Sequence, residues 1–160
     1  MSWARDETQP SPTPVEGWFE PTPEKLTKKL AATRERCGEM SVEYVSLLVQ
    51  LGDAHMVQGR LSNPHAQASY EAALQILLLR GEESPEVAWL YDKLANVKES
   101  SGDIAGARAD LEKALTFWKN HPPANAIAPA VAENHIARRE EDFERLTRVY
   151  EFKLRAPPGA

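Results

Sequence analysis

The sequence has a single cysteine, no excess of basic residues and no long apolar segment, and each of these absences excludes a class of protein. Cys37 is the only cysteine among 160 residues, which excludes an internal disulfide and suits the cytoplasm or another reducing intracellular compartment. There are 19 Lys and Arg against 24 Asp and Glu, giving a net charge of −5, which argues against a protein that binds nucleic acid through a basic face. Apolar runs are short, as at residues 76–79, so we expect neither a membrane span nor a signal peptide.

The sequence also lacks the patterns of catalytic and metal sites. It has no Gly-rich phosphate loop, no Gly-x-Ser-x-Gly, no His-Glu-x-x-His and no Cys-x-x-Cys. The four histidines have no spacing that would gather a metal ion; they are His55, His65, His121 and His135. We therefore expect a protein that is not an enzyme, with no catalytic residue, no metal site and no cofactor.

What the sequence does contain is a repeat of about 42 residues. The first copy has Leu48, Leu51, Gly52, Gly59, Ala66, Tyr70, Ala73 and Leu74, and the second has Tyr91, Leu94, Ala95, Gly102, Ala107, Leu111, Ala114 and Leu115. The offset is 43 residues at the second glycine (102 − 59) and 41 after it (107 − 66), so the first copy has two extra residues in its turn, within residues 61–65. Each copy has the pattern of two helices joined by a turn. Because one such hairpin cannot bury its apolar face alone, the repeat predicts an all-α solenoid of two stacked hairpins.

The small residues of the repeat have a packing role. Helix axes approach closely only where side chains are small, so we expect Gly52 and Ala107 to lie at helix contacts, where leucine would push the helices apart. Gly59 and Gly102 are expected to end the first helices, and Asp103 to cap the helix that follows.

These residues resemble the tetratricopeptide repeat, over about residues 41–121. The long spacing, with Ser84-Pro85-Glu86-Val87-Ala88 leading into a helix, is similar to the variety of the repeat found in kinesin light chains. The ordinary repeat has about 34 residues, so the pattern alone leaves open hairpins of another solenoid family. His55 and Lys98 stand where such repeats usually carry an aromatic side chain.

The segments outside the repeat differ in composition. We expect an extended Pro-rich tail at residues 1–21, a helical domain at 22–154 with repeats at about 41–83 and 84–121, a C-terminal helix at about 129–154, and a flexible tail at 155–160. Thr22 is suited to cap a first helix that ends near Gly38 and covers the first hairpin.

The C-terminal helix has one apolar stripe among many charges. The stripe consists of Ile136, Phe143, Leu146, Tyr150 and Leu154. Two interpretations stay open at this point. The helix either caps the solenoid with a solvated outer face, or binds a partner or a second copy of the chain, for which its stripe is long enough.

The resemblance implies where a partner would bind, because the first helices of tetratricopeptide repeats line a concave groove. Projected onto this chain, the groove residues are Val49, Asp53, Met56, Trp89, Asp92, Asn96 and Glu99. Chaperone-binding members of the family clamp a terminal carboxylate with lysine, arginine and asparagine, and only Asn96 matches that set. The three carboxylates predict instead a groove for a basic or apolar segment, or else they only keep the surface soluble.

Trp18 and Phe19 form a second candidate element in the Pro-rich tail. Adjacent aromatic side chains between two acids look like a docking motif, which would bind the chain's own repeats or a partner. We therefore expect a scaffold or adaptor that binds protein and not nucleic acid. The alternative is a constitutive structural subunit of a large assembly, anchored by the tail.

Overall fold

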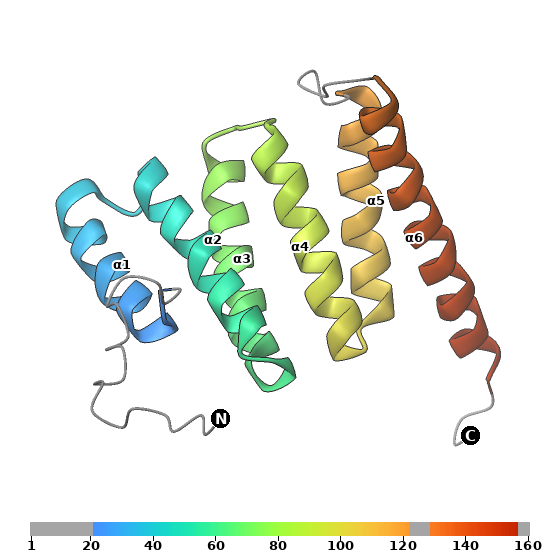
Figure 1. Ribbon diagram of the computed structural model, residues 1–160, viewed down its shortest axis with the longest axis horizontal. Helices are drawn as coiled ribbons and strands as arrows, with labels where there is room; N and C mark the ends of the chain where they lie inside the picture. The colour runs from blue at the N-terminus through green and yellow to red at the C-terminus, as the bar shows by residue number, and fades with distance from the viewer. Residues whose placement is uncertain (1–20, 122–128, 157–160) are drawn as a thin grey trace, which may run out of the picture.

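The structure, a computed structural model, describes residues 21–121 and 129–156, and these form six α-helices and one short 3-10 turn with no strand among them (Figure 1). In chain order the elements are α1 (Pro23–Cys37), α2 (Val42–Val57), η1 (Arg60–Ser62), α3 (Asn63–Leu79), α4 (Pro85–Ser101), α5 (Ile104–Asn120) and α6 (Pro129–Arg155). The expected all-α solenoid of two hairpins is confirmed, with α2 and α3 as the first hairpin and α4 and α5 as the second.

Local sequence signals set the helix ends. The Thr22 hydroxyl accepts a hydrogen bond from the Lys25 backbone N–H (3.4 Å), and Pro23 opens α1, as the sequence predicts. Gly102 ends α4 in the left-handed conformation (φ 88°). The Asp103 carboxylate then caps α5 by accepting from the Gly106 N–H (2.9 Å). In the first hairpin the two extra residues are taken up by η1.

Close helix packing occurs where the repeat has its small residues. A Cβ atom on Gly52 would lie 2.4 Å from the Tyr70 ring, so α2 and α3 meet at a distance that only glycine allows. Ala66, Ala73 and Ala107 are fully buried at the corresponding helix contacts. These are positions at which the repeat pattern places small residues.

The hydrophobic core runs along the row of helices in three parts. The largest part joins α2, α3 and α4 through residues that include Leu48, Tyr70 and Leu94. Two smaller parts join α4 and α5 to α6, where Leu146 is 1% exposed. Each helix packs mainly on the helices before and after it in the chain, as Figure 1 shows, so α6 takes the place of a first helix in a third hairpin.

The two positions that depart from the usual repeat are accommodated in different ways. Lys98 forms a 2.6 Å ion pair with Asp110, and their side chains are only 16% and 8% exposed. His55 packs against His65 of the same hairpin, with ring centroids 5.2 Å apart.

Candidate partner-binding groove

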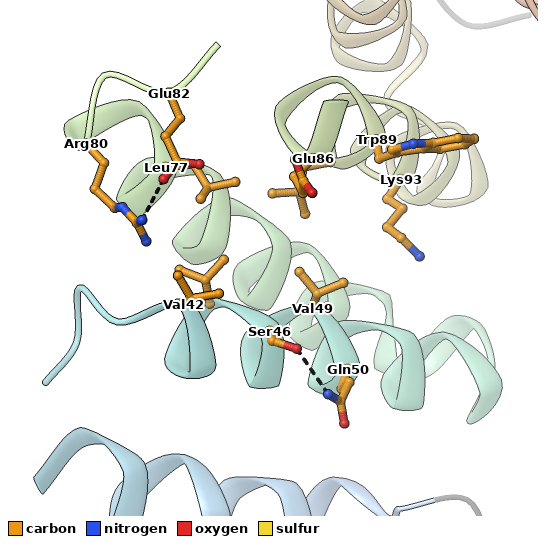
Figure 2. Close-up of a pocket in the computed structure, with 12 residues that line it drawn as sticks. Val42, Ser46, Val49, Gln50, Leu77, Arg80, Glu82, Glu86, Trp89 and Lys93 are labelled. Carbon is orange, nitrogen blue, oxygen red and sulfur yellow. Dashed lines mark hydrogen bonds and ion pairs between the residues drawn. The ribbon is translucent and has the colours of Figure 1, made fainter. Parts of the chain in front are cut away.

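A cavity of about 550 Å³ lies between α2 and α4, above the end of α3 (Figure 2). We call it the α2–α4 groove. It is lined by Val42, Val45, Ser46, Val49, Gln50, Leu77, Arg80, Glu82, Glu86, Trp89, Leu90 and Lys93. Its lining is therefore apolar in the middle, with charged side chains at the margin.

Two elements place the apolar side chains in this groove. On α2, Val45 belongs to the core, and Val42, one turn earlier, is left 64% exposed at the groove. On α4, Trp89 stands between buried Ala88 and Leu90 and is 44% exposed. Val42 therefore offers an exposed apolar side chain to the groove, and Trp89 lies at its edge, with its ring against Trp118 and His135.

Ion pairs within the chain hold the basic side chains of the groove. The Arg80 guanidinium lies 2.8 Å from the Glu82 carboxylate, as Figure 2 shows, and also donates to the Met40 carbonyl oxygen (3.3 Å). Lys93 lies 2.6 Å from the Asp53 carboxylate. Glu86 is exposed in the first turn of α4 and has no basic side chain within 4.0 Å in the described part of the chain.

The residues predicted for the groove divide into two groups. Val49 and Trp89 line the α2–α4 groove. Asp53 lies beside it and accepts hydrogen bonds from the Tyr70 hydroxyl (2.5 Å) and from Lys93. Met56 packs, partly buried, against the core. These four residues lie on α2 and α4, the two helices that border the α2–α4 groove.

Asp92, Asn96 and Glu99 instead line a second cleft, of about 360 Å³, between α4 and α6. The Nε atom of Arg139 lies 3.2 Å from a carboxylate oxygen of Asp92. The two terminal nitrogens of Arg145 donate hydrogen bonds to the two carboxylate oxygens of Glu99. The structure therefore does not bring the seven predicted residues into one groove, because α6 packs beside α4 and forms ion pairs with Asp92 and Glu99, while Asn96 stays exposed.

One expectation for this second group is wrong. Asp92 was expected on the surface, but its side chain is only 9% exposed and also accepts from the Trp118 indole N–H (3.3 Å). Burial raises the pKa of the Asp92 carboxyl, while the Arg139 charge acts in the opposite direction. Each of the three carboxylates forms an ion pair with a basic side chain, Asp53 with Lys93, Asp92 with Arg139 and Glu99 with Arg145. Together they therefore do not form a surface of unpaired negative charge.

Several groove residues were missed by the sequence analysis. Val42 lies seven residues before Val49 on one helix face, a spacing that could have indicated it. Arg80 and Glu82 belong to the loop after α3, and nothing in the repeat pattern indicates that this loop borders the groove. The tail residues Trp18 and Phe19 lie outside the described residues, as does most of the tail on which the assembly-subunit alternative depends.

The described ranges contain neither a cluster of metal ligands nor a helix that could cross a membrane. No three His, Cys, Asp or Glu side chains gather there as metal ligands. None of the helices combines the length and the apolar character that crossing a membrane requires.

The stacked hairpins and their exposed groove define an α-solenoid of the protein-binding kind. Comparison with known families agrees, because a family model described as tetratricopeptide repeat matches residues 43–120. The two hairpins belong to the tetratricopeptide repeat family, whose fold serves protein–protein interaction and is not an enzymatic one.

Among solved structures, BtubC (BKLC) from P. vanneervenii has a similar fold, with a TM-score of 0.59 and 21% sequence identity. The match covers 86% of this chain and 59% of that chain, so the protein spans little more than half of BtubC. At this identity the likeness concerns the fold alone. No curated protein sequence matches the chain.

Proposed function

We propose that the protein is a non-enzymatic scaffold or adaptor that holds a segment of a partner protein in the α2–α4 groove. The observation that carries this proposal is the exposed apolar lining of that groove, above all Val42, with Trp89 at its edge. A solvent-exposed apolar hollow on a repeat fold is the usual place for a peptide or a helix to bind.

The charges at the groove favour one kind of segment. Arg80 and Lys93 are already paired with acidic neighbours, so an acidic ligand would have to displace those neighbours. Glu86 has no such partner within the described residues. We therefore propose a segment with an apolar side chain for the hollow and a lysine or arginine near Glu86.

A displayed random-peptide library selected on the purified protein tests this proposal. We expect enrichment of peptides that combine an apolar or aromatic residue with a basic one. Val42→Lys should lose this enrichment, because it places an ammonium group in the apolar hollow. Val57→Lys is the matched control, since Val57 is an exposed valine (73%) on the same helix outside the groove.

Glu86→Gln tests the charge preference separately. It should retain the apolar preference and lose the basic one, whereas Glu83→Gln in the preceding loop should change neither. Peptides that bind Val42→Lys as well as the wild type would place the ligand elsewhere on the protein.

A further inference from the structure

A second hollow, of about 630 Å³, lies between α1 and α2, on the other side of α2 from α4 (Figure 1). We call it the α1–α2 hollow. α1 contributes Lys29 and Arg36 to its lining, and α2 contributes Val42, Ser46 and Gln50. The same three residues of α2 also line the α2–α4 groove. The two hollows therefore form one continuous surface across α2, along which a bound segment can pass from one to the other.

The α1 side of this surface is basic. Lys29 and Arg36 are both exposed and lie seven residues apart, which places them on one face of α1. Neither forms an ion pair in the described part of the chain, whereas Arg34 of the same helix is paired with Glu39. Among the described residues that line the hollow, Glu43 is the one carboxylate, and it forms no ion pair there. Two cations against one anion leave the α1–α2 hollow with an excess of positive charge.

The α2 side adds a hydrogen-bond donor. The Gln50 side-chain amide donates to the Ser46 hydroxyl oxygen (3.3 Å), as Figure 2 shows. Because that oxygen already accepts a hydrogen bond, the hydroxyl proton is left to be donated to a ligand. A carboxylate held between α1 and α2 would accept from Ser46 and face Lys29 and Arg36, so the hollow suits an acidic group.

The opposite end of the surface has the opposite charge. Glu86 of α4 is exposed and forms no ion pair in the described ranges, while Arg80 and Lys93 are already paired with acids. From α1 to α4 the unpaired charges therefore change from basic to acidic, with the exposed Val42 between them. A surface of this kind favours one direction of a bound segment over the reverse.

From this arrangement we propose that the α1–α2 hollow binds an acidic side chain of the same partner segment whose apolar side chain occupies the α2–α4 groove. The ligand is then a segment with an acid, an apolar residue and a base, in that order from α1 to α4. This inference rests on the proposed function. It adds that α1, which lies outside the matched repeats at residues 43–120, takes part in binding and determines the direction of the segment.

Double-mutant cycles test the assignment of each charge. The probe is a peptide selected on the wild type from the displayed library, with its dissociation constant measured by fluorescence anisotropy. We expect an acid on one side of its apolar residue and a base on the other. Lys29→Gln should be coupled to replacement of the peptide's acid by its amide, and Glu86→Gln to replacement of its base by glutamine. Lys29→Gln and the peptide's base should show no coupling.

Charge reversal on α1 gives the larger effect. Lys29→Glu and Arg36→Glu should each weaken binding of the selected peptide by about tenfold at low salt, and by less as salt is added. Lys28→Glu is the matched control, because Lys28 is the preceding residue of α1, is exposed and lies outside the lining of the hollow. A peptide whose acid is replaced by lysine should bind Lys29→Glu better than it binds the wild type.

The outcomes separate this inference from the proposed function. If Val42→Lys binds the selected peptide as the wild type does, the proposed function fails and this inference fails with it. If Val42→Lys loses the peptide while Lys29→Glu and Arg36→Glu keep it, the groove holds the segment and this inference alone is overturned. If Glu16→Lys restores a melting temperature that Lys29→Glu has lowered, the occupant of the hollow is the chain's own tail, which would also overturn it.

Discussion

At Gly52, the absence of a side chain determines how closely α2 can approach α3. A Cβ atom there would lie 2.4 Å from the Tyr70 ring, and Tyr70 is 2% exposed, so the ring has little room to move. Its hydroxyl is also fixed by the hydrogen bond to Asp53. We expect Gly52→Ala to lower the free energy of unfolding by about 1–3 kcal/mol, measured by urea denaturation, because the added methyl group overpacks the interface.

A second substitution shows whether that loss comes from the contact with Tyr70. In a Tyr70→Leu background the ring is gone, and Gly52→Ala should cost less than it does in the wild type. Equal costs in both backgrounds would mean that backbone effects of the glycine, and not the contact, determine stability at this position.

Single residues also show how far sequence can predict a site. Gly52, Gly102 and Asp103 were predicted correctly because their roles depend on neighbours within one hairpin, which the repeat pattern contains. Asp92 was not, because its burial depends on Arg139, which is 47 residues away on a helix outside the repeat. Lys98 could be identified as a departure from the family, whereas its ion pair with Asp110 could not, although both residues belong to the second hairpin, because the repeat pattern contains apolar and small positions and not the pairing of charged ones.

At the scale of the element, α6 is joined to the repeats by an aromatic cluster that contains a titratable group. The His135 ring meets the edges of Trp89 and Trp118, with centroids 5.1 and 5.0 Å apart. Burial lowers the pKa of His135 below its ordinary value of 6.5, and the nearby Arg139 charge lowers it further, while Asp92 opposes both effects.

This pKa shift predicts how stability depends on pH. Because the folded protein holds His135 neutral, the stabilising contribution is present above pH 6.5 and is lost as the pH falls below it. The melting temperature should therefore decrease between pH 7 and pH 5.5. We expect a shallower decrease in His135→Gln, and no such change in His121→Gln, whose histidine is exposed. An unchanged slope in His135→Gln would contradict the assignment.

The sequence predicted helix α6, but it did not predict that α6 would separate three of the candidate groove residues from the others. The apolar stripe indicated the inner face correctly at Ile136, Phe143 and Leu146, because periodicity records which side is buried, whereas Leu154 of the same stripe is 67% exposed. Periodicity does not record which neighbour covers that side. For this reason the cleft between α4 and α6, and the separation of Asp92, Asn96 and Glu99 from the α2–α4 groove, became visible only in the structure.

At the scale of the whole molecule, stability should vary along the row of helices. In a solenoid each helix is stabilised mainly by the helices on either side, so a helix at the end of the row has one neighbour in place of two. α1 packs mainly on α2, and all of its charged residues are exposed. The largest part of the core, by contrast, joins α2, α3 and α4.

Hydrogen exchange followed by mass spectrometry measures this gradient directly. We expect the slowest amide exchange in α3 and α4, faster exchange in α1, and the fastest helical exchange in residues 151–155, where α6 projects beyond its neighbours. Leu94→Ala, which removes a fully buried side chain from the central part of the core, should speed exchange in α3 and α4 more than in α6, because the loss falls on the nearest interfaces first. If all core amides exchanged equally slowly, and Leu94→Ala accelerated their exchange by the same factor, the row of helices would unfold as one cooperative unit instead.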